Sequence, residues 1–264
     1  RAYARFTGPQ ITAVSQRTPE AWAKTAAVSL VSSFVTSLLL GSLAPIDASD
    51  ACGTNLVDFR ARQWYSTLLE AAAPGLTASR LGGQPCDPNA RLGSLAEAVA
   101  HRWGLPIDCA VIAASGDNPC SLAGLGISSA GDVALSLGTS DTLLGVQSVE
   151  AATPALEGHV MVLPTDAAGS VFCMLCYSNG GDVRRKIRDG LCGGSWDAFD
   201  QALASTSPGN GGILGLRLEL PEITPVIRAT GEFILGPDGK VFSDTDMQLL
   251  PPAVRVRAAV EGPR

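Results

Sequence analysis

Residues 109–142 of the chain read CAVIAASGDNPCSLAGLGISSAGDVALSLGTSDT and carry the strongest fold signal in the sequence. A short apolar run, 109–114, predicts a strand that leads directly into the turn SGDNP at 115–119. After a helix and a connector, a second apolar strand, 132–137, enters the turn GTSD at 138–141, which predicts a hairpin. Strand, turn, helix and hairpin in this order indicate a fold of the α/β class.

Asp117 lies at the end of the first predicted strand, at the sheet edge where ligands of α/β folds gather. A carboxylate there can accept the proton of a sugar hydroxyl as that hydroxyl attacks phosphorus. Asn118 adds a donor and an acceptor for a neighbouring hydroxyl. The structural alternative is that Asp117 forms an Asx-type turn before Pro119 and caps the following helix. The motif alone leaves both interpretations open.

The second turn contains the groups that a phosphate needs. Gly138 lets the backbone approach an anion, and successive amides with the hydroxyls of Thr139 and Ser140 can surround phosphate oxygens. The same residues also form ordinary hairpin turns, which is the commoner situation. No lysine follows them as in G-x-x-x-x-G-K-[ST], so the sequence excludes a P-loop enzyme.

Length, composition and net charge further restrict the classes of protein to which the chain can belong. With 264 residues, 46% apolar and 17% charged, the chain is globular and long enough for one large domain or two smaller ones. A net charge of −6 without a basic stripe argues against a nucleic-acid partner. The one basic cluster, 184–188, is expected to be a solvated helix face, with anion binding as the alternative. The longest apolar stretch, 28–43, is too short and too polar for a membrane span, and no signal peptide opens the chain, so we expect a soluble, cytoplasmic protein.

Cysteine usage predicts no metal site. Cys173 and Cys176 form a C-x-x-C pair inside an apolar run, but no second pair exists and the chain has two histidines. A structural zinc site needs four ligands at suitable spacing. Buried, reduced thiols are therefore the expectation.

The remaining elements follow from periodicity. Helices are expected at 9–16, 18–27, 59–73, 94–103, 119–125 and 196–203, and strands at 142–146, 160–163, 169–177 and around 228–235. The run 28–40 is expected to be a buried strand or two short strands. The change from helix-rich to strand-rich sequence near residue 130 predicts a domain boundary.

The order SGDNP, helix, connector, VALSLGTSDT resembles the centre of the FGGY carbohydrate kinases, and within that family the animal form of the kinases that act on D-xylulose. Further segments are similar in the same order: RAYARFTGPQI at 1–11, SLVSSF at 29–34, PIDASD at 45–50, ALEGH at 155–159, KIRD at 186–189 and PEITP at 221–225.

The resemblance implies an actin-like ATPase fold with two domains on ribonuclease-H-like cores. Residues 1–129 would be the C-terminal part of the sugar-binding domain, and 130–264 the N-terminal part of the ATP-binding domain. The chain is then expected to be an internal fragment, inactive alone. The first phosphate motif with the acid that helps to hold Mg²⁺, a sugar-contacting histidine and a Gly-Gly-Ala-type adenosine motif are expected outside it.

The resemblance also implies roles for single residues: Asp117 as catalytic base, Asn118 and Arg5 as sugar ligands, Gly138, Thr139 and Ser140 as phosphate ligands, and Trp196 as the adenine-side ring. Arg5 could instead be a surface arginine and Trp196 a half-buried core residue. The implied reaction is phosphorylation of D-xylulose to D-xylulose 5-phosphate by ATP with Mg²⁺. Another sugar or polyol of the family (ribulose, glycerol, rhamnulose) and a non-catalytic fragment are the alternatives.

Overall fold

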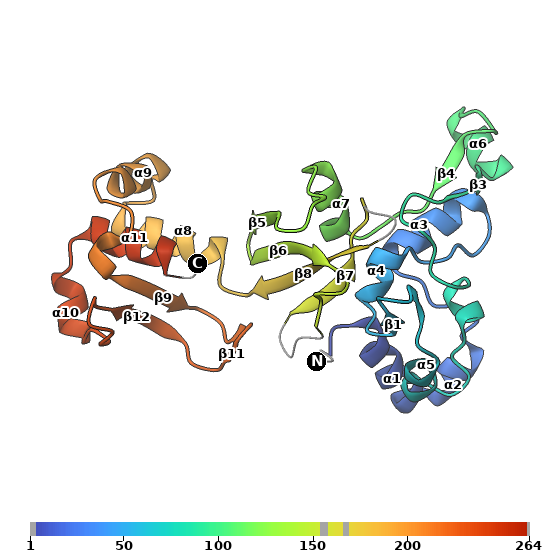
Figure 1. Ribbon diagram of the computed structural model, residues 1–264, viewed down its shortest axis with the longest axis horizontal. Coiled ribbons are helices and arrows are strands. Elements are labelled where there is room, and N and C mark those ends of the chain that lie inside the picture. Colours follow the sequence, from blue (N-terminus) through green and yellow to red (C-terminus); the bar gives the residue numbers. More distant parts are fainter. Residues whose placement is uncertain (1–3, 154–157, 166–168, 263–264) are drawn as a thin grey trace. The chain divides into compact units, whose positions relative to one another are not determined.

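The computed structural model describes residues 4–153, 158–165 and 169–262, and the chain separates into two compact units. The first unit comprises Arg1–Ala134 and Leu144–Met174, and the second comprises Leu135–Leu143 and Leu175–Arg264. Figure 1 shows the elements of both units along the chain. The assignment of 1–129 and 130–264 to two family domains stays a prediction.

The first unit begins with helices that the sequence predicts. Helix α1 spans Thr7–Arg17 and α2 spans Pro19–Lys24, with Pro19 at the first helical position. The other helices of this unit are α3 (Val31–Leu40), α4 (Ala48–Cys52), α5 (Ser66–Ala72), the 3₁₀ turn η1 (Ala78–Leu81), α6 (Glu97–Trp103) and α7 (Asp117–Gly124). Gly104 ends α6 in the left-handed conformation, as its position after a helical run predicts.

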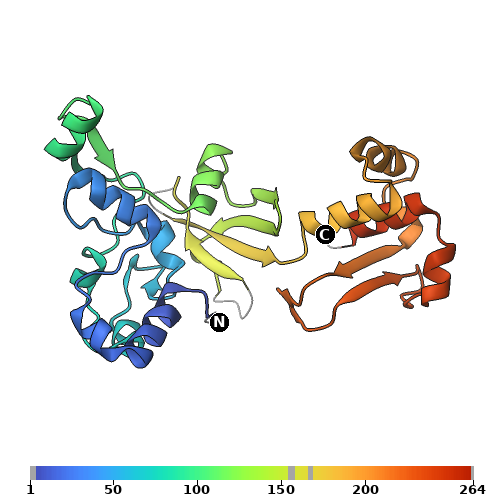
Figure 2. The same cartoon turned by 180° about the vertical axis from the view of Figure 1, so that it is seen from behind.

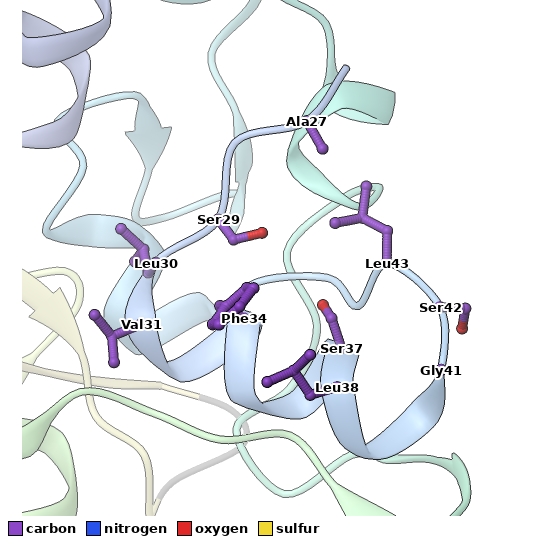
Figure 3. Close-up of a pocket in the computed structure, with 10 residues that line it drawn as sticks. All are labelled: Ala27, Ser29, Leu30, Val31, Phe34, Ser37, Leu38, Gly41, Ser42 and Leu43. Carbon is purple, nitrogen blue, oxygen red and sulfur yellow. The ribbon is translucent and has the colours of Figure 1, made fainter. Parts of the chain in front are cut away.

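Helix α3 corrects the expectation of strands at 28–40. Its hydroxyl side chains bond to carbonyls of the same helix: Thr36 to Ser32 at 3.0 Å and Ser37 to Ser33 at 2.6 Å. The hydroxyl of Ser33 donates to the carbonyl of Leu30 at 3.2 Å. Because these bonds satisfy the hydroxyls, Ser33 and Thr36 can be buried while the apolar side faces outward. Figure 3 shows that outward side, where Val31, Phe34 and Leu38 border a hollow of about 750 Å³.

The predicted helix 59–73 is also wrong in its first half. The strands β1 (Val57–Asp58) and β2 (Gln63–Trp64) pair antiparallel, and only 66–72 is helical. Asp58 accepts from the amides of Arg60 and Ala61, at 2.9 and 3.1 Å. This side-chain turn competes with the helix and folds the segment into a hairpin.

A four-stranded sheet follows α7, with strand order β5-β6-β8-β7. Its strands are β5 (Val133–Leu137), β6 (Asp141–Ser148), β7 (His159–Val162) and β8 (Ser170–Tyr177), which confirms the predicted hairpin and the two strands after it. The residues of β5, β6 and β8 are divided between the two units. Leu122 of α7 packs with Leu144, Val162 and Phe172 in the core of the first unit. The strands β3 (Arg91–Ser94) and β4 (Ala110–Ile112) form a separate antiparallel pair.

The second unit places helices against a small antiparallel sheet. Its elements are α8 (Gly181–Leu191), α9 (Trp196–Ala204), η2 (Asn210–Gly212), β9 (Leu214–Leu218), β10 (Glu222–Ile223), β11 (Val226–Ile227), β12 (Gly231–Leu235), α10 (Asp244–Leu249) and α11 (Pro252–Glu261). Figure 2 shows α8 and α11 side by side next to the β9–β12 pair. Val183, Ile187, Phe199 and Val256 form the core there. Ser195 caps α9 through a bond from the amide of Ala198, at the start of the predicted helix 196–203.

The structure bears on the expectations for the cysteines, for metal sites and for membrane-spanning helices. All seven cysteines are free thiols, but Cys173 and Cys176 are half-buried on β8 rather than buried. Within the described ranges, no three His, Cys, Asp or Glu side chains group in a way that could hold a metal ion. No helix in the same ranges combines the length and the apolar character needed to cross a bilayer.

The core position of α7 generates a stability prediction. Leu122 is completely buried, whereas Leu125, at the end of the same helix, is 67% exposed. We expect Leu122→Ala to lower the free energy of unfolding by about 2–5 kcal/mol, because it leaves a cavity between α7 and the sheet. The matched variant Leu125→Ala should change it by no more than about 0.5 kcal/mol. Urea unfolding followed by circular dichroism measures both, and equal losses would contradict the packing described here.

Candidate active site

A buried carboxylate fixes the turn that carries Asp117. Asp47 precedes α4, and its Oδ1 accepts from the amides of Ser49 and Asp50 at 3.0 and 3.3 Å. The same oxygen accepts from the hydroxyl of Ser115 at 2.9 Å. Burial raises the pKa of Asp47 to about 6. Asp47 therefore joins the start of α4 to the residues immediately before Asp117.

Asp117 itself is exposed at the first position of α7. Its Oδ1 accepts from the amide of Asn118 at 2.8 Å and from the Asn118 side-chain Nδ2 at 3.2 Å. Gly116, and not Asp117, occupies the N-cap position, and no side chain caps it. The structure therefore does not show the alternative of an Asx-type turn that caps the helix: the carboxylate bonds to the adjacent Asn118, and Pro119 has no amide N–H to donate. The carboxylate stays accessible.

A second carboxylate, which the sequence prediction overlooked, lies next to this turn. A Cβ atom on Gly116 would lie 2.7 Å from Oδ1 of Asp50. Oδ2 of Asp50 accepts from the hydroxyl of Ser32 at 2.5 Å. Burial raises the pKa of Asp50, and the charge of Asp117 raises it further. The similarity of PIDASD at 45–50 to the kinase family was the signal that could have found Asp50.

Arg5 precedes Phe6, the residue immediately before α1. Its guanidinium is 5.5 Å from the centre of the Phe6 ring, which packs edge-to-face on His159 at 4.4 Å. Helix α4 packs on β7, with the Ser49 hydroxyl donating to the carbonyl of Val162 at 2.6 Å. These contacts place Arg5 near the first residue of β7, and α4 packs on that strand within the first unit.

The phosphate-type turn Gly138–Ser140 lies exposed between β5 and β6, against the start of α8. The amide of Gly138 donates to the carbonyl of Ser140 at 3.2 Å, and the amide of Gly181 donates to the carbonyl of Gly138 at 2.8 Å. A Cβ atom on Gly181 would lie 2.4 Å from the Gly138 carbonyl oxygen, and one on Gly180 would lie 2.6 Å from the amide of Asp141. Glycine at both positions therefore permits the close approach of the turn to the helix.

An ion pair between α8 and the first residue of β6 holds the turn in place. Arg184 of α8 donates to both oxygens of Asp141, at 2.6 and 2.8 Å, and the two side chains are only 19% and 11% exposed. The paired carboxylate raises the pKa of Arg184. Arg184 is thus committed to Asp141, which corrects the expectation that the whole basic cluster 184–188 is a solvated face.

A pocket of about 370 Å³ opens beside the turn in the second unit. This volume falls within the range of small-molecule sites. It is lined by Thr139, Ser140, Ser178, Asn179, Asp182, Val183, Lys186, Glu219 and Leu220. Its hydroxyls, amides and single cation next to a glycine-supported turn suit phosphate oxygens. The two carboxylates of the lining are each paired with a cation, Asp182 with Arg185 and Glu219 with Lys186 and Arg217.

Trp196, the expected adenine-side ring, is half-exposed at the first position of α9. The guanidinium of Arg188 lies 4.7 Å from its ring centre, and Phe199 packs on its edge at 5.3 Å. Trp196 and the turn Gly138–Ser140 therefore both neighbour α8, at Arg188 and at Gly181 respectively. Trp196 packs on Phe199 through one edge of its ring. The alternative of a half-buried core residue accounts for that edge and not for the rest of the ring.

Several known kinases are similar to this chain in sequence or in fold. The chain is 42% identical over 262 residues to the xylulose kinase of Rattus norvegicus, and the alignment covers 99% of this chain and 46% of that protein. The solved structure of xylulose kinase from Rhodospirillum rubrum matches with a TM-score of 0.79 at 18% identity, covering 98% of this chain and 50% of that one. The gluconate kinase of Lactobacillus acidophilus matches with a TM-score of 0.80 at 17% identity and the same coverage. No family model matches the sequence.

The fold and the two turns define the class: this chain has, in part, the actin-like fold of the FGGY carbohydrate kinases, as the resemblance predicted. Its sequence is similar to xylulose kinases of an animal and a plant, at 42% identity for the Rattus norvegicus protein and 41% for xylulose kinase 2 of Arabidopsis thaliana. The chain spans about half the length of the curated relatives it matches.

The pKa of Asp47 generates a prediction about pH. Because its pKa rises from 3.8 to about 6 on folding, the folded state binds an extra proton between these values. Asp47 therefore contributes stability that is present below about pH 4 and is lost as the pH rises through about 6, on the order of 2–3 kcal/mol. Asp47→Asn keeps the Oδ1 acceptor and removes the titration. We expect its free energy of unfolding to fall less with pH than that of the unaltered chain.

The measurement is urea unfolding of both proteins between pH 4 and 7. His159, whose pKa burial lowers to about 4, contributes a slope of the opposite sign, but it is common to both chains. The difference between the two curves thus reports Asp47. Asp108→Asn, which removes an exposed carboxylate, is the control. Identical pH slopes for Asp47→Asn and the unaltered chain would contradict the assignment.

The close approach of α8 to the phosphate-type turn generates a second prediction. Gly181→Ala places a methyl group against the Gly138 carbonyl, so we expect it to cost about 1–3 kcal/mol of stability. Gly190, on the same helix, has open space around it. Gly190→Ala should therefore raise stability by up to about 1 kcal/mol through helix propensity. Thermal unfolding distinguishes the two; a neutral Gly181→Ala would show that the turn does not depend on this contact.

Proposed function

We propose that the protein containing this chain is an ATP-dependent xylulokinase, which converts D-xylulose to D-xylulose 5-phosphate. The observation that supports this most is the combination, in a sequence 42% identical to rat xylulose kinase, of an accessible carboxylate and a glycine-supported turn at a phosphate-sized pocket. The activity is proposed for the whole protein, in the cytoplasm. The 264 residues alone, about half the length of the relatives, are expected to be inactive.

In the proposed reaction, Asp117 accepts the proton of the terminal hydroxyl of the sugar as that oxygen attacks the γ-phosphorus of ATP. The hydrogen bonds from Asn118 fix the carboxylate in one orientation. Asn118 and Arg5 position the sugar hydroxyls.

On the nucleotide side, Gly138, Thr139 and Ser140 bind phosphate oxygens through amides and hydroxyls. Trp196 offers the adenine the ring face that Arg188 does not cover. Mg²⁺, when bound to ATP, supplies neutralisation of the phosphate charge. The described residues do not form a metal site by themselves, so its protein ligand is expected in the part of the family sequence that this chain does not match.

The choice of sugar is the least constrained part of the proposal. A gluconate kinase matches the fold as well as a xylulose kinase does, so the fold alone does not discriminate between these substrates. A panel of D-xylulose, ribulose, rhamnulose and glycerol decides the matter. We expect the highest kcat/KM for D-xylulose.

The base assignment is tested in the longest polypeptide that contains these 264 residues. Asp117→Asn should lower kcat by about 10²–10⁴-fold, because it removes the proton acceptor, and should leave sugar binding largely intact. The control Asp108→Asn should keep full activity. Sugar-dependent ADP release measures turnover, and calorimetry measures sugar binding. Near-normal turnover of Asp117→Asn would show that another group takes the proton, and robust turnover by the 264 residues alone would contradict their expected inactivity.

A further inference from the structure

The four basic residues of α8 make different contacts. One of them, Lys186, borders the pocket beside the phosphate-type turn. Arg184 is held by Asp141, and Arg185 pairs with Asp182 at 2.5 Å on the surface. Arg188 pairs with Asp189 at 2.6 Å and covers Trp196. Lys186 is the single cation among the residues that line the pocket beside Thr139 and Ser140.

The contacts of Lys186 permit a change of partner. Its Nζ lies 2.5 Å from Oε2 of Glu219, and the lysine side chain is 54% exposed. An ion pair at such an exposed position contributes little to stability, so breaking it costs little. A lysine stem of four methylenes can reach another acceptor in the same pocket without movement of the helix.

Glu219 would not be left unpaired by that exchange. Its other oxygen, Oε1, accepts from Nε of Arg217 at 2.7 Å. The side-chain oxygen of Asn179 accepts from the backbone amide of Glu219 at 2.8 Å, which fixes the position of the residue. Glu219 can therefore hold Lys186 at the rim of the pocket when no anion is bound, and release it without leaving an uncompensated charge.

We propose that Lys186 is the cation that binds the ATP phosphates in this pocket, opposite the turn Gly138–Ser140, and that Glu219 is its resting partner. The inference rests on the proposed function and adds to it a phosphate ligand and a competing carboxylate. On binding, Nζ moves from the carboxylate of Glu219 to a phosphate oxygen, a charge-assisted contact of the kind that lysine makes at phosphate sites. No covalent bond changes. Glu219 keeps Arg217 throughout.

The test measures anion binding to the 264-residue chain by calorimetry, with ATP and, separately, with inorganic tripolyphosphate. Lys186→Gln should weaken both by about tenfold, the effect of losing one charge-assisted contact. Lys186→Arg should restore most of the affinity. Glu219→Gln should tighten binding of both anions, because it removes the competitor of the phosphate. Circular dichroism establishes that each variant is folded.

Lys240→Gln is the matched control. Lys240 is also in the second unit and also pairs with a carboxylate, Asp238 at 3.0 Å, but it is 84% exposed and does not line the pocket. Its replacement removes the same charge and should leave both affinities unchanged. Equal affinities of Lys186→Gln and Lys240→Gln would overturn the role of Lys186. Weaker binding by Glu219→Gln would also overturn it, since the pair would then be structural.

The test of Lys186 and the test of the proposed function can fail independently of each other. If the unaltered chain binds neither ATP nor tripolyphosphate, the pocket is not a phosphate site and the inference fails. The ADP-release assay in the longer polypeptide would still decide independently whether Asp117 supports sugar phosphorylation.

Discussion

In the first unit, the turn that carries Asp117 depends on the burial of one carboxylate, Asp47. This carboxylate caps α4 and accepts from Ser115, and the backbone of Asp47 forms a parallel bridge to Cys86. Its second oxygen, Oδ2, is buried without a hydrogen-bond partner among the described residues. Burying a charged group in this way is unfavourable, and the raised pKa of Asp47 expresses that cost. This cost is offset because the other oxygen, Oδ1, fixes both the helix that carries Asp50 and the turn that carries Asp117.

The second unit is organised differently, around the outward and inward sides of α8. Its inward residues, Val183 and Ile187, form core, while its charged residues anchor a turn, border a pocket and cover an aromatic ring. A helix that does all of this must be placed accurately along its axis. Gly180 and Gly181 provide that placement, since they let the backbone of α8 contact the backbone of the turn directly.

Local signals made much of this fold predictable, and non-local contacts account for what was missed. The hairpin at 132–146, the cap at Ser195 and the end of α6 at Gly104 depend on neighbours within a few residues, and the sequence predicts them. Helix α3 was missed because its polar and apolar sides are reversed relative to an ordinary amphipathic helix. Asp50 was missed because its neighbour Gly116 is distant in sequence. For the cluster 184–188 the sequence left anion binding as an alternative but could not single out Lys186, because its partner Glu219 is distant in sequence. The roles of Asp117, Arg5 and Trp196 came from the resemblance, and they stay predictions.

The division of β5, β6 and β8 between the two units means that the backbone passes from one unit to the other three times, at 134–135, 143–144 and 174–175. Two compact units joined by a single linker can be separated by one cut or expressed independently. Here neither unit is a continuous segment, so a single cleavage of the chain leaves both attached through the remaining connections. The nine residues 135–143 illustrate the point: they contain the phosphate-type turn and count with the second unit, yet both of their ends continue into the first.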